Sequence, residues 1–312
     1  MTDAEAIARA SQAARAWGGA TDAPILIRNR ENIVLKATLK AGQTAAIRLH
    51  RKDYQTLDAI QSELNWTAAL SKAGFPCPAP LPREDGDLTF LFEDGQVCSV
   101  ISWINAEQIG ANGVAFDGTP NAQLHLYERI GRLIADLHQT TDRLDLSEMV
   151  RPNWSIDGFV GRDPLWGHFW RNPALTSKEV EILQRARKNA AQHLERLSDP
   201  QIGLIHADVL QENILQTDRL WLIDFDDSGY GFRDYDLGTA LIQHAESPHL
   251  DELEAALLSG YAAPQDDLSL WIMLRSMASC GWIISRADHD DPRQRFYAER
   301  ALRCVARYER KN

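Results

Sequence analysis

The sequence predicts an α+β fold, in which a small β-rich lobe with one helix precedes a larger, mainly helical lobe. Three observations support this prediction. Short runs of β-branched and apolar residues gather before residue 105, helical periodicity dominates after it, and the two kinds of segment do not alternate. Regular alternation would have indicated parallel βαβ units instead.

The small lobe is expected to be an antiparallel sheet with one helix. That helix, at 56–73, ends at Gly74 before a series of prolines that suits an extended connector. A further short helix is expected at 4–17, ahead of the first strand. A turn signal at 40–43 joins two of the strands as a hairpin. The strands are expected at residues 25–27, 33–39, 45–49, 88–92 and 97–101.

The large lobe is expected to be mainly helical around one strand-rich segment at 206–226. The spacing of Thr176 and Glu179 predicts the start of one helix, because the two side chains can form a capping box. The helices are expected at residues 122–138, 176–197, 234–246, 250–261, 266–287 and 292–309.

Composition and charge exclude several classes of function. The net charge is −11 and no cluster of Lys and Arg is evident, so a nucleic-acid partner is not expected. No stretch approaches the roughly 20 apolar residues of a membrane span, and the start lacks the pattern of a secretory leader. A cytoplasmic protein without a membrane partner is therefore expected. The four cysteines show no metal-ligand spacing and are expected to be small buried apolar residues.

The residues that can carry chemistry gather between His206 and Asp226. Two apolar runs flank the polar turn at 216–219, and an antiparallel hairpin centred there would place Asn213 opposite Asp224. Directly opposed residues have Cβ atoms about 4.5–5.5 Å apart, so an amide oxygen and a carboxylate would meet at the open end of the hairpin. Hard oxygen ligands of this kind suit Mg²⁺, whose other positions are filled by water or phosphate.

Asp208 precedes Asn213 by a short loop and is expected to lie beside the same site. A carboxylate near the metal, but not bound to it, can take the proton of an attacking hydroxyl group. His206 is expected to brace this loop rather than to carry protons. A base, metal ligands and electrostatic positioning are what phosphoryl transfer requires of a protein.

The pattern H-A-D-x-x-x-x-N at 206–213, followed by I-D-F-D at 223–226, resembles the aminoglycoside phosphotransferase family. That family includes homoserine-kinase-type, choline-kinase-like and stress-response kinases, and is related to the protein kinases. Its pattern is H-G-D-x-x-x-x-N and then I-D-[FW]. The chain departs from this pattern in having Ala207 in place of the glycine.

The resemblance implies a protein-kinase-like two-lobed fold. It implies an N-terminal nucleotide-binding lobe at 1–101, a hinge at 102–106 and a C-terminal catalytic and substrate-binding lobe at 107–312. Backbone groups near the hinge would contact adenine, with Ile101 and Trp103 as apolar walls. For either side chain, a place in an ordinary core strand is the alternative.

The same resemblance implies a role for each residue of the motif. Asp208 would be the catalytic base, and Asn213 and Asp224 would bind Mg²⁺. Asp226 would be a further ligand or would support the ligands. ATP and Mg²⁺ are the cofactors that follow from these roles.

Nucleotide binding in the small lobe is expected to depend on Arg48 and Glu63. Arg48 stands where kinases have a strand lysine, and a glutamate on the next helix would pair with it to hold the ATP phosphates. Arginine can bind phosphate bidentately, although a surface position on an edge strand is the alternative. No glycine-rich loop is present, and the turn at 29–32 is expected to cover the phosphates, with Asn32 among the binding residues.

These features predict transfer of the γ-phosphoryl group of ATP to a hydroxyl group of a small metabolite. An amino alcohol, or a homoserine-like, choline-like or aminoglycoside-like compound, would be the acceptor. A Ser/Thr protein kinase of the stress-response type and a catalytically impaired kinase-like binding protein are the alternatives. The sequence does not assign an oligomeric state.

Overall fold

The computed structural model describes residues 1–29, 32–111, 114, 118–262 and 267–311. The chain forms two compact units. The expected lobe boundaries and the hinge at 102–106 stay predictions. Unit 1 consists of Met1–Glu107, Leu144–Arg151 and Trp221–Asp226, whereas unit 2 consists of Gln108–Arg143, Pro152–Leu220 and Asp227–Asn312.

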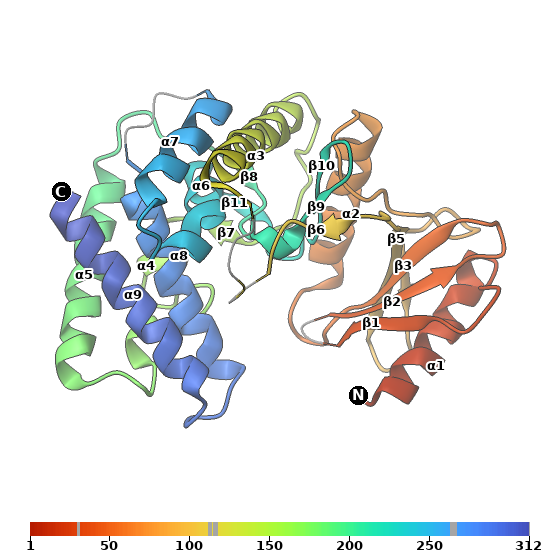
Figure 1. Ribbon diagram of the computed structural model, residues 1–312. Helices are drawn as coiled ribbons and strands as arrows, with labels where there is room; N and C mark the ends of the chain where they lie inside the picture. The colour runs from red at the N-terminus through yellow and green to blue at the C-terminus, as the bar shows by residue number, and fades with distance from the viewer. Residues whose placement is uncertain (30–31, 112–113, 115–117, 263–266, 312) are drawn as a thin grey trace. The chain divides into compact units, whose positions relative to one another are not determined.

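Unit 1 is built on a five-stranded antiparallel sheet, coloured red to yellow in Figure 1. The strand order is β1-β2-β3-β5-β4, so β3 lies at the centre with β2 and β5 as its neighbours. The predicted hairpin turn is present, and Gly42 adopts the left-handed backbone that such a turn requires. The strands are β1 (Ile25–Asn29), β2 (Ile33–Thr38), β3 (Thr44–Leu49), β4 (Thr89–Leu91) and β5 (Val97–Ser102).

Two helices pack on opposite faces of this sheet. Helix α1 (Asp3–Ala14), which a short 3-10 turn η1 (Arg15–Trp17) continues, packs its alanines against Ile47, Leu49 and the other residues of that face. Helix α2 (Leu57–Lys72) packs Ile60 and Leu64 against Val97 on the other face. Because side chains alternate along a strand, Arg48 points toward the α2 side. Helix α1 confirms the short helix expected at 4–17, and α2 confirms the helix expected at 56–73.

Unit 2 is mainly helical, as expected. Helices α3 and α7 approach closely, because Gly131 and Gly260 leave no room for a Cβ against the backbone of the opposite helix. The capping box of Thr176 and Glu179 is present at the start of α5. Helices α8 and α9 form a hairpin (Figure 1). The helices are α3 (Pro120–Thr141), α4 (Ile156–Val160), α5 (Ser177–Glu195), α6 (Asp234–Leu241), α7 (Leu250–Tyr261), α8 (Ser269–Trp282) and α9 (Pro292–Lys311).

A small three-stranded sheet lies in unit 2 beside these helices. Its order is β7-β11-β8, with β11 parallel to β7 and antiparallel to β8. Neither β7 nor β11 is expected from the sequence, because both are short and two of the four residues of β11 are glycine. The strands are β7 (Asn153–Trp154), β8 (Ile202–Ile205) and β11 (Gly229–Phe232). Strand β8 ends directly before His206, and β11 ends just before α6.

The remaining elements are short. They are the strands β6 (Glu107–Gln108), β9 (Ile214–Gln216) and β10 (Leu220–Leu222), and the 3-10 turns η2 (Phe169–Arg171), η3 (Gln211–Asn213), η4 (Ile242–His244) and η5 (Ile283–Ser285). All four cysteines are buried and unbridged, which confirms their expected place in the core. Within the described ranges, no helix combines the length and apolarity that crossing a bilayer demands.

Candidate active site

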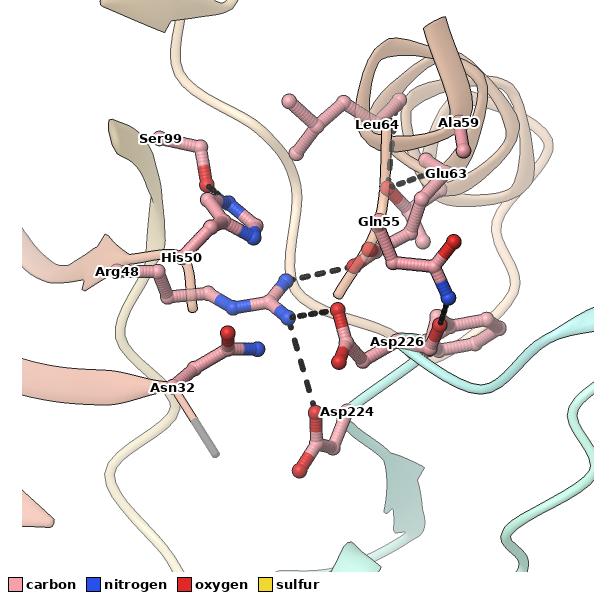
Figure 2. A network of polar contacts seen from close by, with 12 residues as sticks. Asn32, Arg48, His50, Gln55, Ala59, Glu63, Leu64, Ser99, Asp224 and Asp226 are labelled. Carbon is pink, nitrogen blue, oxygen red and sulfur yellow. Dashed lines mark hydrogen bonds and ion pairs between the residues drawn. The ribbon is translucent and has the colours of Figure 1, made fainter. Parts of the chain in front are cut away.

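Arg48 and Glu63 form a buried ion pair in unit 1. Arg48 Nη1 donates to Glu63 Oε1 over 2.6 Å, and the two residues are 5% and 1% exposed. Figure 2 shows the guanidinium pointing from β3 toward the carboxylate on α2. The expected pairing of these two residues is thus present, and the alternative of a surface arginine is excluded. Their contact with a nucleotide stays a prediction.

The same guanidinium lies near two further carboxylates. Arg48 Nη2 is 3.7 Å from Asp224 Oδ1 and 3.7 Å from Asp226 Oδ1, and it makes no hydrogen bond within the described residues (Figure 2). Burial disfavours the charge on Arg48, but Glu63 and the two aspartates together raise its pKa above the ordinary value. Arg151 also acts on Glu63, so the three carboxylates exceed the two nearby arginines by one negative charge. Such a cluster suits a divalent cation.

The segment that carries Asp224 and Asp226 is tied to α2. Arg151 Nη1 donates to the carbonyl of Ala59 over 2.8 Å, while its Nη2 donates to the carbonyl of Asp226 over 2.6 Å. The Phe225 ring packs edge-on against Trp66 of α2 at 5.3 Å. Sequence reasoning missed Arg151, because hydrogen bonds to main-chain carbonyls leave no pattern in the sequence. These contacts fix the two aspartates relative to Glu63.

Two residues of the motif adopt the left-handed backbone conformation. Ala207 has φ 65° and Asp224 has φ 67°. This conformation costs most residues roughly 1–2 kcal/mol, whereas glycine adopts it freely. The glycine of the family pattern at position 207 therefore has a conformational reason, and alanine keeps the same geometry at some cost. Strain of this kind often accompanies functional loops.

Asp208 is held through both carboxylate oxygens in unit 2. Arg275 Nη2 donates to Asp208 Oδ1 over 2.6 Å, and Asn213 Nδ2 donates to Asp208 Oδ2 over 2.8 Å. Asn213 Nδ2 also donates to the main-chain carbonyl of Asp208 over 2.9 Å. Since the amide nitrogen of Asn213 is used in these bonds, its amide oxygen is the atom that suits a cation.

A buried carboxylate on α6 shapes the loop before Asp208. Asp236 accepts hydrogen bonds from the main-chain N–H groups of His206 at 2.9 Å and Ala207 at 2.7 Å, and its Oδ2 lies 3.1 Å from His138 Nε2. His206 Nδ1 accepts from the main-chain N–H of Asp208 over 3.2 Å. The bracing expected of His206 is therefore present, and Asp236 supports the same loop.

Arg275 is a residue of this site that sequence reasoning missed. It is 5% exposed on α8, donates through Nη1 to Ser279 Oγ at 2.6 Å, and lies 4.6 Å from the centre of the Trp166 ring. The sequence shows it only as a charged residue within an apolar helix. A single charged residue in an otherwise apolar, buried helix could have indicated a buried ion pair, because such a charge needs a partner. The partner is Asp208.

Of the residues expected around adenine, Ile101 lies near the end of β5 and Trp103 directly follows that strand. Ile101 packs against the cluster of Ile60 and Leu64, and Trp103 lies half-buried beneath Lys36, whose Nζ is 4.7 Å from the ring centre. Asn32 is buried, and its Oδ1 accepts from the main-chain N–H of Arg51 at 3.1 Å. Their contact with nucleotide stays a prediction. Two residues of the turn expected over the phosphates, 30 and 31, lie outside the described residues.

The register argument for Asn213 and Asp224 is wrong. Asn213 ends the turn η3, and Asp224 has a left-handed backbone beyond the end of β10, so neither residue belongs to a strand. Strand alternation therefore does not place them opposite each other. Asn213 belongs to unit 2 and Asp224 to unit 1. Their sharing of one Mg²⁺ ion stays a prediction.

The sequence matches known proteins over most of its length. The model of the phosphotransferase enzyme family matches residues 27–271. Homoserine kinase from Sinorhizobium medicae is 31% identical over 204 residues, which are 62% of this chain and 55% of that protein. Homoserine kinase from Rhizobium meliloti is 31% identical over 203 residues, with the same coverage. The chain thus spans about half the length of the curated relatives it matches.

Solved structures resemble the whole chain. The microcompartment-associated aminopropanol kinase is 24% identical with a TM-score of 0.81, and the match covers 97% of both chains. Amicoumacin kinase, solved in complex with AMP-PNP, Ca²⁺ and Ami, is 18% identical with a TM-score of 0.76 over 98% of this chain and 94% of that one. These likenesses confirm the predicted α+β, protein-kinase-like fold. Because the family model spans more than three quarters of its sequence, the chain belongs to the phosphotransferase enzyme family.

Proposed function

We propose that the protein transfers the γ-phosphoryl group of ATP to a hydroxyl group of a small metabolite. The observation that carries this proposal is the Asp208 loop, where a carboxylate is fixed beside an amide and braced by Asp236. Family membership supports it, as do relatives named as kinases of homoserine and aminopropanol. An amino alcohol, or a homoserine-like, choline-like or aminoglycoside-like compound, is the proposed class of acceptor.

Asp208 acts as the base in this proposal. Its carboxylate accepts the proton of the acceptor hydroxyl group as the oxygen attacks the γ-phosphorus, and ADP leaves with the electrons of the broken P–O bond. Arg275 keeps Asp208 in one orientation, because a guanidinium donates in a fixed planar geometry. A base held in place in this way needs little rearrangement when the acceptor binds.

Nucleotide binding is assigned to the unit 1 residues. Arg48, oriented by Glu63, contacts the α- and β-phosphates, and Asn32, Ile101 and Trp103 contribute to the nucleotide site. In this proposal residues 1–101 form the nucleotide-binding lobe, 102–106 the hinge, and 107–312 the lobe that binds the acceptor.

Asn213, Asp224 and Asp226 are the proposed Mg²⁺ ligands. The excess of carboxylates around Arg48 and the orientation of the Asn213 amide both fit an oxygen-binding cation. The ion would neutralise charge on the phosphate oxygens. Few protein ligands suffice, because Mg²⁺ keeps waters and phosphate oxygens in its other positions. Amicoumacin kinase, solved with AMP-PNP and Ca²⁺, supports a nucleotide and a divalent cation in this fold.

The test is a panel of hydroxyl metabolites assayed for ADP release with ATP and Mg²⁺. Asp208→Asn keeps the size of the side chain but removes the base, so acceptor-dependent turnover is expected to fall about 10²–10⁴-fold. Turnover that persists in Asp208→Asn would refute the assignment of the base. Phosphate incorporated into the protein itself, with no acceptor-dependent ADP release, would favour the protein-kinase alternative. ATP binding without either reaction would favour the impaired kinase-like protein.

A further inference from the structure

Arg300 on α9 is a buried arginine without a carboxylate partner. It is 7% exposed, and within the described chain it forms no ion pair and its Nε makes no hydrogen bond. Its guanidinium carbon instead lies 4.8 Å from the ring centre of Tyr297 and 5.5 Å from that of Phe296.

Other buried arginines of the described chain are bonded through their guanidinium groups, Arg151 to main-chain carbonyl groups. Arg48 pairs with Glu63, and Arg275 pairs with Asp208. Arg307, which is partly buried two turns beyond Arg300 on the same helix, pairs with a glutamate and an aspartate. Arg48, Arg275 and Arg307 each have a carboxylate within ion-pair distance. Arg300 lies beside aromatic rings, and among the described residues the nearest acidic influence on its charge comes from Glu246, beyond ion-pair distance.

An uncompensated guanidinium is expensive to bury. Arginine does not give up its proton at ordinary pH, so it cannot become neutral as a buried lysine or histidine does. Burial lowers the pKa of Arg300 below its ordinary value, and the positive charge of Arg275 acts in the same direction. Ring contacts return only part of the lost hydration. A binding anion would supply the missing partner.

Arg300 belongs to the same neighbourhood as the proposed base. Its helix α9 packs along α8, which carries Arg275. The Tyr297 ring contacts Arg300 and also interacts electrostatically with Arg275. Arg275 in turn donates to Asp208. The packing of α9 on α8 therefore places Arg300 on the helix next to the one whose Arg275 holds the carboxylate that is proposed to activate the acceptor.

We propose that Arg300 binds a carboxylate group of the phosphoryl acceptor, so that the preferred acceptors are small hydroxy acids. The planar guanidinium can hold a carboxylate through two parallel hydrogen bonds. Arg275 is already paired with Asp208, whereas Arg300 makes no ion pair within the described residues and can take a negative group of the substrate. This inference rests on the proposed function, because it concerns the acceptor of that reaction.

The first experiment needs no variant. L-Homoserine and 3-aminopropan-1-ol have the same amino alcohol skeleton, and only the first carries a carboxylate. We expect kcat/KM for homoserine to exceed that for 3-aminopropan-1-ol by about 10–100-fold, the range of a charge-assisted hydrogen bond. Equal values for the two acceptors, or a preference for 3-aminopropan-1-ol, would overturn the inference.

The second experiment replaces the charge. Arg300→Met is expected to lower kcat/KM for homoserine about 10–100-fold, mainly through KM, and to lower kcat/KM for 3-aminopropan-1-ol much less. Arg300→Lys, which keeps a charge but not the fork, should retain part of the preference. Arg303→Met is the matched control, because Arg303 lies on the same helix and pairs with Glu246 at the surface. An equal loss for both acceptors in Arg300→Met would contradict carboxylate binding.

Binding without turnover separates this inference from the proposed function. Homoserine alone should raise the melting temperature of the wild-type protein and of Arg303→Met, but not that of Arg300→Met. If no acceptor is phosphorylated yet this pattern holds, the kinase proposal fails and the carboxylate site stands. If 3-aminopropan-1-ol is phosphorylated well and homoserine neither binds nor reacts, the kinase proposal stands and the carboxylate site fails.

Discussion

Replacing Arg48 by methionine is expected to destabilise the protein more than replacing its partner Glu63 by glutamine. Arg48→Met leaves the carboxylates of Glu63, Asp224 and Asp226 without the cation that lies between them. Glu63→Gln removes one of the three negative charges and leaves Arg48 beside two aspartates. The order of the two effects therefore tests whether the cluster has an excess of negative charge.

The structure sets the size of these effects. Removing one partner of a buried ion pair costs about 3–5 kcal/mol, because the other charge stays desolvated. Arg48 and Glu63 are both almost fully buried, so this range applies to Arg48→Met. The longer contact to Asp224, whose side chain is 40% exposed, adds at most about 1 kcal/mol. For Glu63→Gln we expect about 2–3 kcal/mol, because Arg48 keeps two aspartates nearby.

Urea unfolding with and without Mg²⁺ measures both the order and its cause. Mg²⁺ should restore part of the lost stability in Arg48→Met, because a divalent cation can take the place of the guanidinium among the carboxylates. Sodium chloride at the same ionic strength controls for general screening. The reasoning is refuted if Glu63→Gln is as destabilising as Arg48→Met. It is also refuted if Mg²⁺ stabilises Arg48→Met no more than sodium chloride does.

Two further predictions concern single residues. Burial, together with the charge of Arg48, lowers the pKa of His50 from 6.5 to about 3. As the pH drops below 6.5, the unfolded chain binds a proton at this histidine while the folded protein does not, so the stability of the fold decreases. Between pH 7.5 and 5.5 the free energy of unfolding should fall by about 1.4 kcal/mol because of His50. Urea titrations at both pH values should show that His50→Gln removes this fall, whereas His125→Gln, at an exposed site, keeps it. The same pH dependence in the wild-type protein and in His50→Gln would contradict the reasoning. Asp236→Asn places an amide N–H donor near two backbone N–H groups that now donate to a carboxylate. We expect the free energy of unfolding to fall by about 1–3 kcal/mol and turnover to fall roughly 10–100-fold. Unchanged melting temperature and ADP release in that variant would contradict the bracing role.

Much of the fold follows from patterns that are local in the sequence. The predicted helix at 250–261 agrees with α7, and the capping box of Thr176 and Glu179 starts α5 as expected. Helical periodicity and side-chain caps act over a few residues, so they can be recognised without knowledge of the tertiary structure. The short strands β7 and β11 were missed because they depend on pairing with distant strands rather than on their own composition.

The sequence alone determined the order of the elements, the family motif and the pairing of Arg48 with Glu63. Only the tertiary structure decided which groups surround the proposed base. The bond of Arg275 to Asp208 spans 67 positions of the chain, and that of Asp236 to the His206 main chain spans 30. Such contacts depend on how helices pack, not on the spacing of residue types. For the same reason the lone charge of Arg300 has a meaning only once its neighbours are known.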